Sequence, residues 1–177
     1  MKFIFSIIFI FLSFSVMAEG ITNKYLTKEQ KQAWSGVGRV NIIGGNHRIC
    51  SGVLISDTYI LTAAHCVVNE NTGIAHTPNR IQFSAGWNDD GASAYGQAKR
   101  VFIHKRYKTS SVLSDDIVSS DLAIIELSMP MNANGIKPYY LHKLPIKKKN
   151  INIVSYVESP SEATITKKEC NVLEHRN

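Results

Sequence analysis

Beyond its first sixteen residues, the sequence has no apolar run long enough to cross a bilayer. It also contains no internal repeat and no low-complexity segment. Charged residues make up only 19% of the chain and hydrophobic residues 44%, which is typical of a globular protein and not of a disordered one. The 177 residues fit one domain, since a domain usually takes roughly 100–200 residues.

Acidic residues are fewer than basic ones, 14 against 20, which gives a net charge of +6. The excess is scattered, apart from a run of three lysines at residues 147–149. No aromatic residues alternate with these charges and no basic helix is indicated, so the sequence does not predict nucleic-acid binding. A weak attraction to anionic surfaces stays open. Nothing in the sequence indicates an oligomeric state.

The sequence also has few cysteines and no metal-binding motif. The chain has three cysteines, Cys50, Cys66 and Cys170, so at least one thiol lacks a partner within the chain. Its six histidines form no His-Glu-x-x-His motif and no close pair. The spacing therefore predicts no metal site, and no cofactor is expected.

The N-terminus has the pattern of a secretory signal peptide. Lys2 supplies a positive charge, an apolar run follows to Val16, and small residues stand at Val16 and Ala18, where a signal peptidase reads the chain. The run is shorter than the ~20 residues of a membrane anchor. We expect cleavage after Ala18 and a secreted or periplasmic protein that is not membrane-bound afterwards, in a compartment that permits disulfides.

After a polar connector, the chain has the pattern of an all-β protein. Thr27 and Gln30 predict a capping box for a short helix that ends near Trp34. From Gly36 onward, short β-rich runs alternate with turn residues, which is typical of a barrel or sandwich. The predicted strands are Arg48–Ile55, Tyr59–Thr62, Ile81–Ala85, Gln97–Ile103, Leu122–Leu127, Ile151–Val157 and Ala163–Thr166.

Two short stretches combine residues suited to acid–base chemistry. Residues 61–66 read Leu-Thr-Ala-Ala-His-Cys, and they place His65 at the end of a predicted strand. A histidine there can act as a general base if its partner lies within hydrogen-bond reach. Asp121 opens the apolar run that follows it, so its carboxylate can be partly buried. Asp115 and Asp116 are alternatives for the same role.

These stretches resemble the trypsin and chymotrypsin family of serine proteases. The histidine motif is preceded by Cys-Ser-Gly-Val-Leu-Ile at residues 50–55, and Asp-Leu-Ala at residues 121–123 resembles the family's aspartate motif. The resemblance implies that His65 is the general base and that Asp121 orients it. It also implies a disulfide between Cys50 and Cys66, worth ~3 kcal/mol for a loop of about 15 residues. Protein or peptide substrates follow from the same resemblance.

The sequence departs from the family at the nucleophile. No Gly-x-Ser-Gly follows Asp121, the last glycine is Gly135, and none of the serines at positions 155, 159 and 161 has a glycine neighbour. The family's cysteine near Cys170 pairs with one close to the nucleophile, which this sequence lacks. We therefore expect a chain that is cut short.

The first residues that resemble the family also differ from the pattern of trypsin itself. Residues 42–45 read Ile-Ile-Gly-Gly, like a new N-terminus made by activation cleavage, but Asn41 precedes them and only four residues separate Gly45 from Cys50. We expect a bacterial-type branch without that cleavage.

Together these observations predict an all-β, trypsin-like double barrel with its first barrel complete and its second barrel partial. The expected divisions are a signal peptide at 1–18, a connector at 19–35 and a protease domain at 36–177, with barrels at about 36–130 and 137–177. The expected function is that of a serine endopeptidase that is inactive as given because it lacks the nucleophile. The alternative is a secreted pseudoprotease that acts as a protein-binding module.

Overall fold

The structure, a computed structural model, describes residues 24–25, 27–44, 49–87, 90–132, 135–141, 150–157 and 164–171. The predicted signal peptide lies outside these ranges. None of the helices in the described ranges is both long and apolar enough to span a bilayer.

The described elements are mostly strands. In chain order they are β1 (Lys24–Tyr25), α1 (Lys28–Ala33), β2 (Val37–Ile42), β3 (Cys50–Leu54), β4 (Tyr59–Thr62), the 3-10 turns η1 (Ala64–Cys66) and η2 (Pro78–Arg80), β5 (Ile81–Ala85), β6 (Ala94–Ile103), α2 (Asp115–Ser120), β7 (Ala123–Leu127), β8 (Asn150–Val157) and β9 (Thr164–Asn171).

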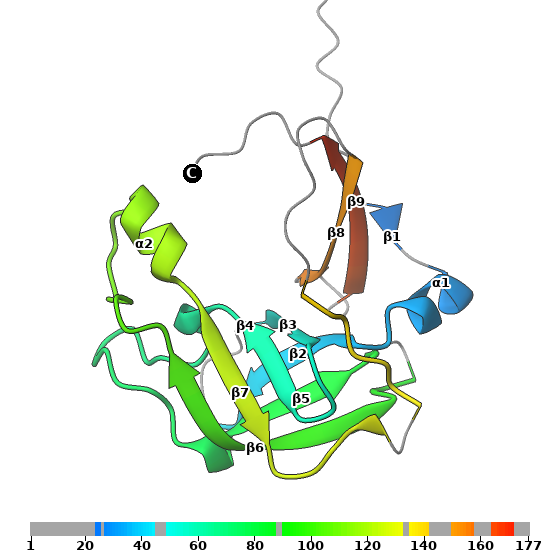
Figure 1. Cartoon of the computed structure of the whole chain (residues 1–177), viewed down its shortest axis with the longest axis horizontal. Helices are drawn as coiled ribbons and strands as arrows, with labels where there is room; N and C mark the ends of the chain where they lie inside the picture. The colour runs from blue at the N-terminus through cyan, green and yellow to red at the C-terminus, as the bar shows by residue number, and fades with distance from the viewer. Residues whose placement is uncertain are drawn as a thin grey trace, which may run out of the picture.

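Six strands form a closed antiparallel barrel in the order β2-β3-β4-β7-β6-β5, seen in the lower part of Figure 1. Closure pairs every strand on both sides, so the barrel has no open edge. Its interior holds Leu54, Ile60, Phe83 and Ile125, none of which has an exposed side chain. The first-barrel prediction is confirmed.

A glycine on β2 makes room for the largest core side chain. A Cβ at Gly38 would lie 2.5 Å from the ring of Phe83 and 2.5 Å from the carbonyl oxygen of Ser84. Because one of these neighbours is backbone, any larger residue at position 38 would push β2 away from β5.

The remaining strands form a three-stranded sheet in the order β1-β9-β8, above the barrel in Figure 1. Within the described ranges this sheet stays open, which agrees with the predicted partial second barrel. Tyr156 of β8 links it to the first barrel: its backbone N–H donates to Ser51 Oγ at 2.8 Å, and its hydroxyl donates to the carbonyl oxygen of Trp87 at 3.0 Å. Burial raises the pKa of Tyr156, so this hydroxyl stays protonated and remains a donor.

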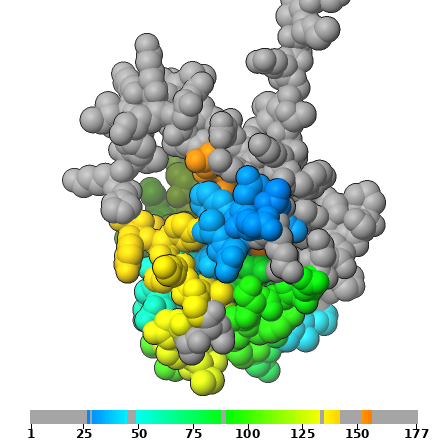
Figure 2. All heavy atoms as spheres, turned by 90° about the vertical axis from the view of Figure 1, so that its right-hand side faces the viewer, coloured from blue at the N-terminus to red at the C-terminus, as the bar shows by residue number. Residues whose placement is uncertain are grey.

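The predicted connector also contributes to the fold. Its strand β1 pairs with β9, and its helix α1 has the predicted capping box between Thr27 and Gln30. Trp34, at the end of α1, stacks on Tyr139 with ring centroids 5.8 Å apart. Figure 2 shows the blue N-terminal segment packed beside the yellow segment that contains Tyr139. The segment is therefore a structural part of the protein as well as a link.

An apolar row crosses the outer face of five barrel strands. The strand register aligns its members directly opposite one another in the order Val37, Val53, Leu61, Ile124 and Phe102. The Val37 end is buried beneath the cluster that includes Tyr156, Trp34 and Tyr139, while Phe102 is 47% exposed. Among the described residues, the second sheet therefore covers the Val37 end of the row.

The strand predictions agree with the structure where hydrophobic patterning is strong. The predicted bounds of β4 and β5 match the observed ones, and those of β3, β7 and β8 differ by one or two residues within the described ranges. Strand β6 begins at Ala94 and β9 runs to Asn171, so both are longer than predicted.

Strands β1 and β2, helix α2 and the two 3-10 turns were absent from the predictions. Strand β2 reads Val-Gly-Arg-Val-Asn-Ile, and its glycine and two polar residues weaken the alternating pattern. Helix α2 is only six residues long, although Ser114 caps it by accepting a hydrogen bond from the Ile117 N–H. Ile42 is the last residue of β2 and pairs with Ile81, Ile43 and Gly44 follow in a turn, and Gly45 lies outside the described residues.

Glu126 of β7 forms a charged cluster on the barrel wall. It is 7% exposed, accepts a hydrogen bond from Arg100 on β6, and lies 3.2 Å from Lys99 Nζ. The hydrogen bond from Arg100 is the main cause of a lowered pKa at Glu126, with Lys99 acting in the same direction and burial opposing both.

The lowered pKa makes part of the protein's stability pH-dependent. For a carboxyl group whose pKa in the folded protein lies below its pKa in the unfolded chain, about 4.3, the ionised form stabilises the fold fully at pH values above about 4.3. This stabilisation is lost as the pH falls through the pKa of the folded protein. Glu126→Gln should therefore lower the free energy of unfolding at pH 7, and the difference from the parent should shrink below about pH 4. Urea unfolding of both proteins across this pH range measures the difference in the free energy of unfolding. When both proteins also carry Arg100→Gln, this difference should change less with pH. An equally large change would contradict Arg100 as the main cause of the lowered pKa of Glu126.

Candidate active site

His65 lies in a tight turn at the end of a barrel strand. Strand β4 ends at Thr62, and η1 then places Ala64 and Cys66 in the core while His65 points outward, its side chain 46% exposed. The small side chains before the histidine allow the turn to pack closely against the barrel. His65 is thus an exposed side chain on a buried support.

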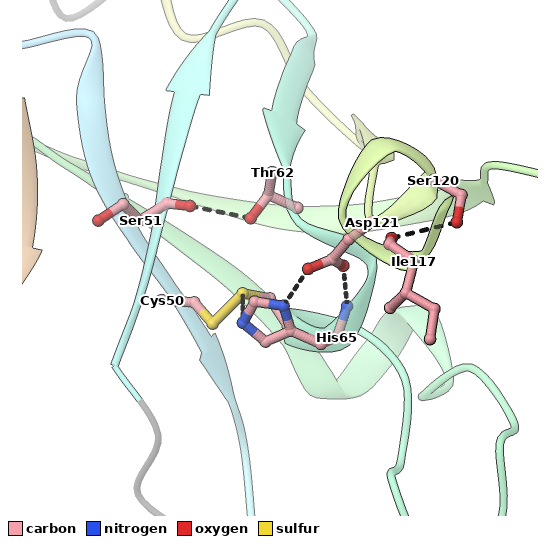
Figure 3. A network of polar contacts seen from close by, with 8 residues as sticks. Cys50, Ser51, Thr62, His65, Ile117, Ser120 and Asp121 are labelled. Atoms are coloured by element: carbon pink, nitrogen blue, oxygen red, sulfur yellow. Dashed lines mark hydrogen bonds and ion pairs between the residues drawn. A yellow bond between two sulfur atoms is a disulfide. The ribbon is translucent and has the colours of Figure 1, made fainter. Parts of the chain in front are cut away.

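A disulfide fixes this turn to the neighbouring strand. Cys66 in η1 is bonded to Cys50, the first residue of β3, with a Cα–Cα distance of 5.9 Å. Figure 3 shows the bond directly beside the imidazole ring. This is the disulfide that the family resemblance implies. It ties the residue after the histidine to a strand of the closed barrel.

Asp121 is brought to His65 by the pairing of β4 with β7. In that pairing Thr62 lies opposite Ala123, so the residues after β4 and before β7 meet at the same end of the barrel. Asp121 is also the C-cap residue of α2. Residues that are 56 positions apart in sequence therefore become neighbours.

The Asp121 carboxylate holds His65 through two contacts (Figure 3). Its Oδ2 lies 2.6 Å from His65 Nδ1, and its Oδ1 accepts a hydrogen bond from the His65 backbone N–H at 2.9 Å. An ionised carboxylate can only accept, so Nδ1 carries the ring proton and donates it. The lone pair of the neutral imidazole is then on Nε2, which is the nitrogen that could take up a proton.

Asp115 and Asp116 occupy the first turn of α2, one helix length before Asp121. Of the three candidates, only Asp121 contacts His65 among the described residues. The helix that separates them was not predicted, although Ser114 followed by two acidic residues is a recognised helix-start pattern.

Two pockets adjoin His65, and Glu70 also lines both of them. One has a volume of about 310 Å³ and is lined by the disulfide, Glu70, His76 and Arg80 among others. The other has a volume of about 480 Å³ and is lined by Tyr107, Leu113, Ile117 and Asp121 among others. Each pocket is a recess beside the histidine.

Charge and burial affect two groups near these pockets. Burial, and then the negative charges of Asp121 and Glu70, raise the pKa of Tyr107. Burial, followed by the positive charge of Arg80, lowers the pKa of His76. Tyr107 is therefore a neutral phenol near the Asp121 carboxylate, and His76 is neutral more readily than an ordinary histidine.

His65 Nε2 contacts Cys66 Sγ at 3.5 Å. Among the side chains that the structure describes, no hydroxyl group forms a hydrogen bond with this nitrogen. Of the late serines, Ser155 belongs to β8, and Ser159 and Ser161 lie outside the described residues.

Replacing Asp121 should invert the tautomer of His65. In Asp121→Asn the amide oxygen can still accept from the backbone N–H of His65, but the amide nitrogen can only donate, so Nδ1 becomes the acceptor and the proton moves to Nε2. Nitrogen chemical shifts of labelled histidine distinguish the two tautomers. Asp116→Asn is the matched control and should leave the proton on Nδ1. If both variants keep the parent tautomer, Asp121 does not set it.

Comparisons with known proteins place this geometry in a family. The Trypsin family model matches residues 25–156, which is more than half of the chain. A trypsin of Phaedon cochleariae is 31% identical over 101 residues, which are 56% of this chain and 34% of that protein. The kallikrein 1-related peptidase b27 of Mus musculus is 27% identical over 126 residues, 67% of this chain and 44% of that protein. The chain thus spans less than half the length of either relative.

A solved structure shows the same fold. A Glu endopeptidase in complex with MPD superimposes with a TM-score of 0.69 at 16% identity, covering 87% of this chain and 69% of that one. With its closed barrel and the family match across it, the chain belongs to the trypsin family of serine proteases.

Proposed function

We propose that the protein is a serine endopeptidase by descent, with His65 as the general base and Asp121 as the residue that orients it. The contact of 2.6 Å between His65 Nδ1 and Asp121 Oδ2 supports this proposal most directly. A second support is that His65 lines two pockets, through which a substrate could reach it. The family acts on protein or peptide substrates, and we propose the same class here.

The proposed roles follow from the protonation of the ring. A serine hydroxyl that attacks a peptide carbonyl must lose its proton, and Nε2 of His65 can take it because Nδ1 is already protonated. The resulting imidazolium is stabilised by Asp121 and returns the proton to the leaving amine. A water molecule then attacks the acyl group, His65 takes up its proton in the same way, and the acyl group is released from the serine. The backbone N–H of His65 is bonded to Asp121, so it does not serve as an oxyanion donor.

The missing motif limits what these 177 residues can do alone. Because no Gly-x-Ser-Gly follows Asp121, we propose that the polypeptide by itself has no appreciable peptidase activity. Loss of the nucleophile costs about 10⁶ in turnover in a well-studied serine protease. We further propose that residues 1–18 direct export and that residues 36–177 form the protease domain.

A direct assay tests the proposed inactivity. The purified protein and its His65→Ala variant should hydrolyse fluorescent casein at the same background rate, and neither should react with a fluorophosphonate that labels activated serines. A folded state for both is checked by near-ultraviolet circular dichroism. Hydrolysis by the parent that His65→Ala abolishes would show that another residue serves as the nucleophile.

The transcript beyond the codon for Asn177 tests the proposed lineage. A Gly-x-Ser-Gly in frame, or one frameshift away, would supply the expected nucleophile and support a serine endopeptidase. A stop codon with no such motif downstream would exclude the peptidase. The alternative would then apply, in which the first barrel and its recess bind a protein partner without chemistry.

A further inference from the structure

The disulfide and the histidine beside it form a compact set of potential metal ligands. The Sγ atoms of Cys50 and Cys66 and a ring nitrogen of His65 all lie within 4.8 Å of one another. All three residues line the 310 Å³ pocket, so the set is open to small solutes. While the disulfide is intact the sulfurs are bonded to each other, and neither can act as a thiolate ligand.

The distance between nitrogen and sulfur already suits a tetrahedral cation. Zinc binds thiolate sulfur at about 2.3 Å and imidazole nitrogen at about 2.0 Å, so the two ligand atoms lie about 3.5 Å apart across a tetrahedral angle. His65 Nε2 lies 3.5 Å from Cys66 Sγ. The two sulfurs would need to separate to about 3.8 Å by the same geometry.

The partner of His65 also suits metal binding. A histidine that binds a metal through one ring nitrogen usually donates its other N–H to a carboxylate or carbonyl, which fixes the ring and its tautomer. Asp121 accepts from Nδ1 at 2.6 Å and so leaves the Nε2 lone pair on the side of the sulfurs. The contact that prepares His65 for proton transfer therefore also prepares it as a ligand.

The backbone around the two cysteines is held by bonds other than the disulfide. Cys50 pairs with Val40 in the ladder between β2 and β3, and the N–H of Cys66 donates to the carbonyl oxygen of Ala63 in η1. Both belong to the core of the closed barrel. The backbone positions of the two thiols can thus persist after the disulfide is opened.

We propose that reduction of the Cys50–Cys66 disulfide converts this cluster into a binding site for a soft divalent cation of the Zn²⁺ class. A phosphine supplies two electrons and takes an oxygen atom from water, the S–S bond breaks, and the two sulfurs become thiols. The cation then displaces one proton from each thiol and binds both thiolates and the lone pair of Nε2. Its fourth position opens on the pocket.

Metal binding would also occupy the nitrogen that proton transfer requires. A cation on Nε2 blocks uptake of a proton by His65, so the reduced, metal-bound protein could not act as a general base. Only this consequence depends on the proposed function. The binding site itself depends on the three ligands and on Asp121.

Cobalt(II) is a suitable probe because tetrahedral thiolate coordination gives it intense visible bands and a sulfur-to-metal charge-transfer band. The protein carrying Cys170→Ser, which removes the third thiol, should bind one equivalent of Co²⁺ with these bands after reduction by a phosphine. The same protein without reductant should show none. Excess Zn²⁺ should displace the Co²⁺ and bleach the bands.

Variants separate the proposed site from adventitious binding. In the same background Cys66→Ser and His65→Ala should abolish the tetrahedral spectrum, and Asp121→Asn should weaken Co²⁺ binding by about tenfold or more. His104→Ala, a histidine outside the cluster, is the matched control and should bind like the parent.

Folding is monitored separately, since reduction could unfold the barrel. Near-ultraviolet circular dichroism should show that the reduced protein keeps its tertiary structure, and unfolding by urea should remove the bands. The proposal is overturned if the reduced, folded protein gives no tetrahedral Co²⁺ spectrum, or if the spectrum survives in urea or in His65→Ala. It is equally overturned if reduction alone unfolds the barrel. None of these outcomes bears on whether the protein descends from a peptidase.

Discussion

The pairing of β4 with β7 is the constraint on which the site depends. Antiparallel neighbours close in sequence form hairpins readily, but these strands are separated by the whole of β5, β6 and α2. Their pairing closes the barrel and sets Thr62 opposite Ala123. Because side chains alternate along a strand, a shift of one residue would turn the apolar residues of β7 outward and move Asp121 away from His65.

Around this pairing, the site is built from the turn η1, which carries His65, and the helix α2, which precedes Asp121. The disulfide and the buried flanking residues fix the turn that carries His65, while Asp121 follows α2 as its C-cap residue and supplies the carboxylate. The two contacts from Asp121 then determine both the position of the turn and the tautomer of the ring. Both proposed roles of His65, proton transfer in the oxidised protein and binding of a cation in the reduced one, require a lone pair on Nε2.

Among the described residues, Tyr156 joins the second sheet to the barrel. Tyr156 bonds to Ser51 and Trp87, and Trp34 and Tyr139 cover the Val37 end of the outer apolar row. The other end, at Phe102, is about half exposed. Apolar surface is stabilising only where it is removed from water, so the barrel core contributes more to the stability of the described fold than this junction does.

The sequence alone determined the fold class, the family resemblance, the histidine motif and most of the strands, because regular alternation and a run of specific residues are local signals. It also predicted the capping box of α1, which depends on two residues three positions apart. Strand β2 escaped prediction because Gly38, Arg39 and Asn41 obscure its alternation, and only its pairing with β3 and β5 stabilises it as a strand. Asp121 was already favoured over Asp115 and Asp116 by the resemblance of residues 121–123 to the family's motif, but its contact with His65 could not be read from the sequence. Barrel closure brings Asp121 to His65, and that register is a property of strands far apart in the chain.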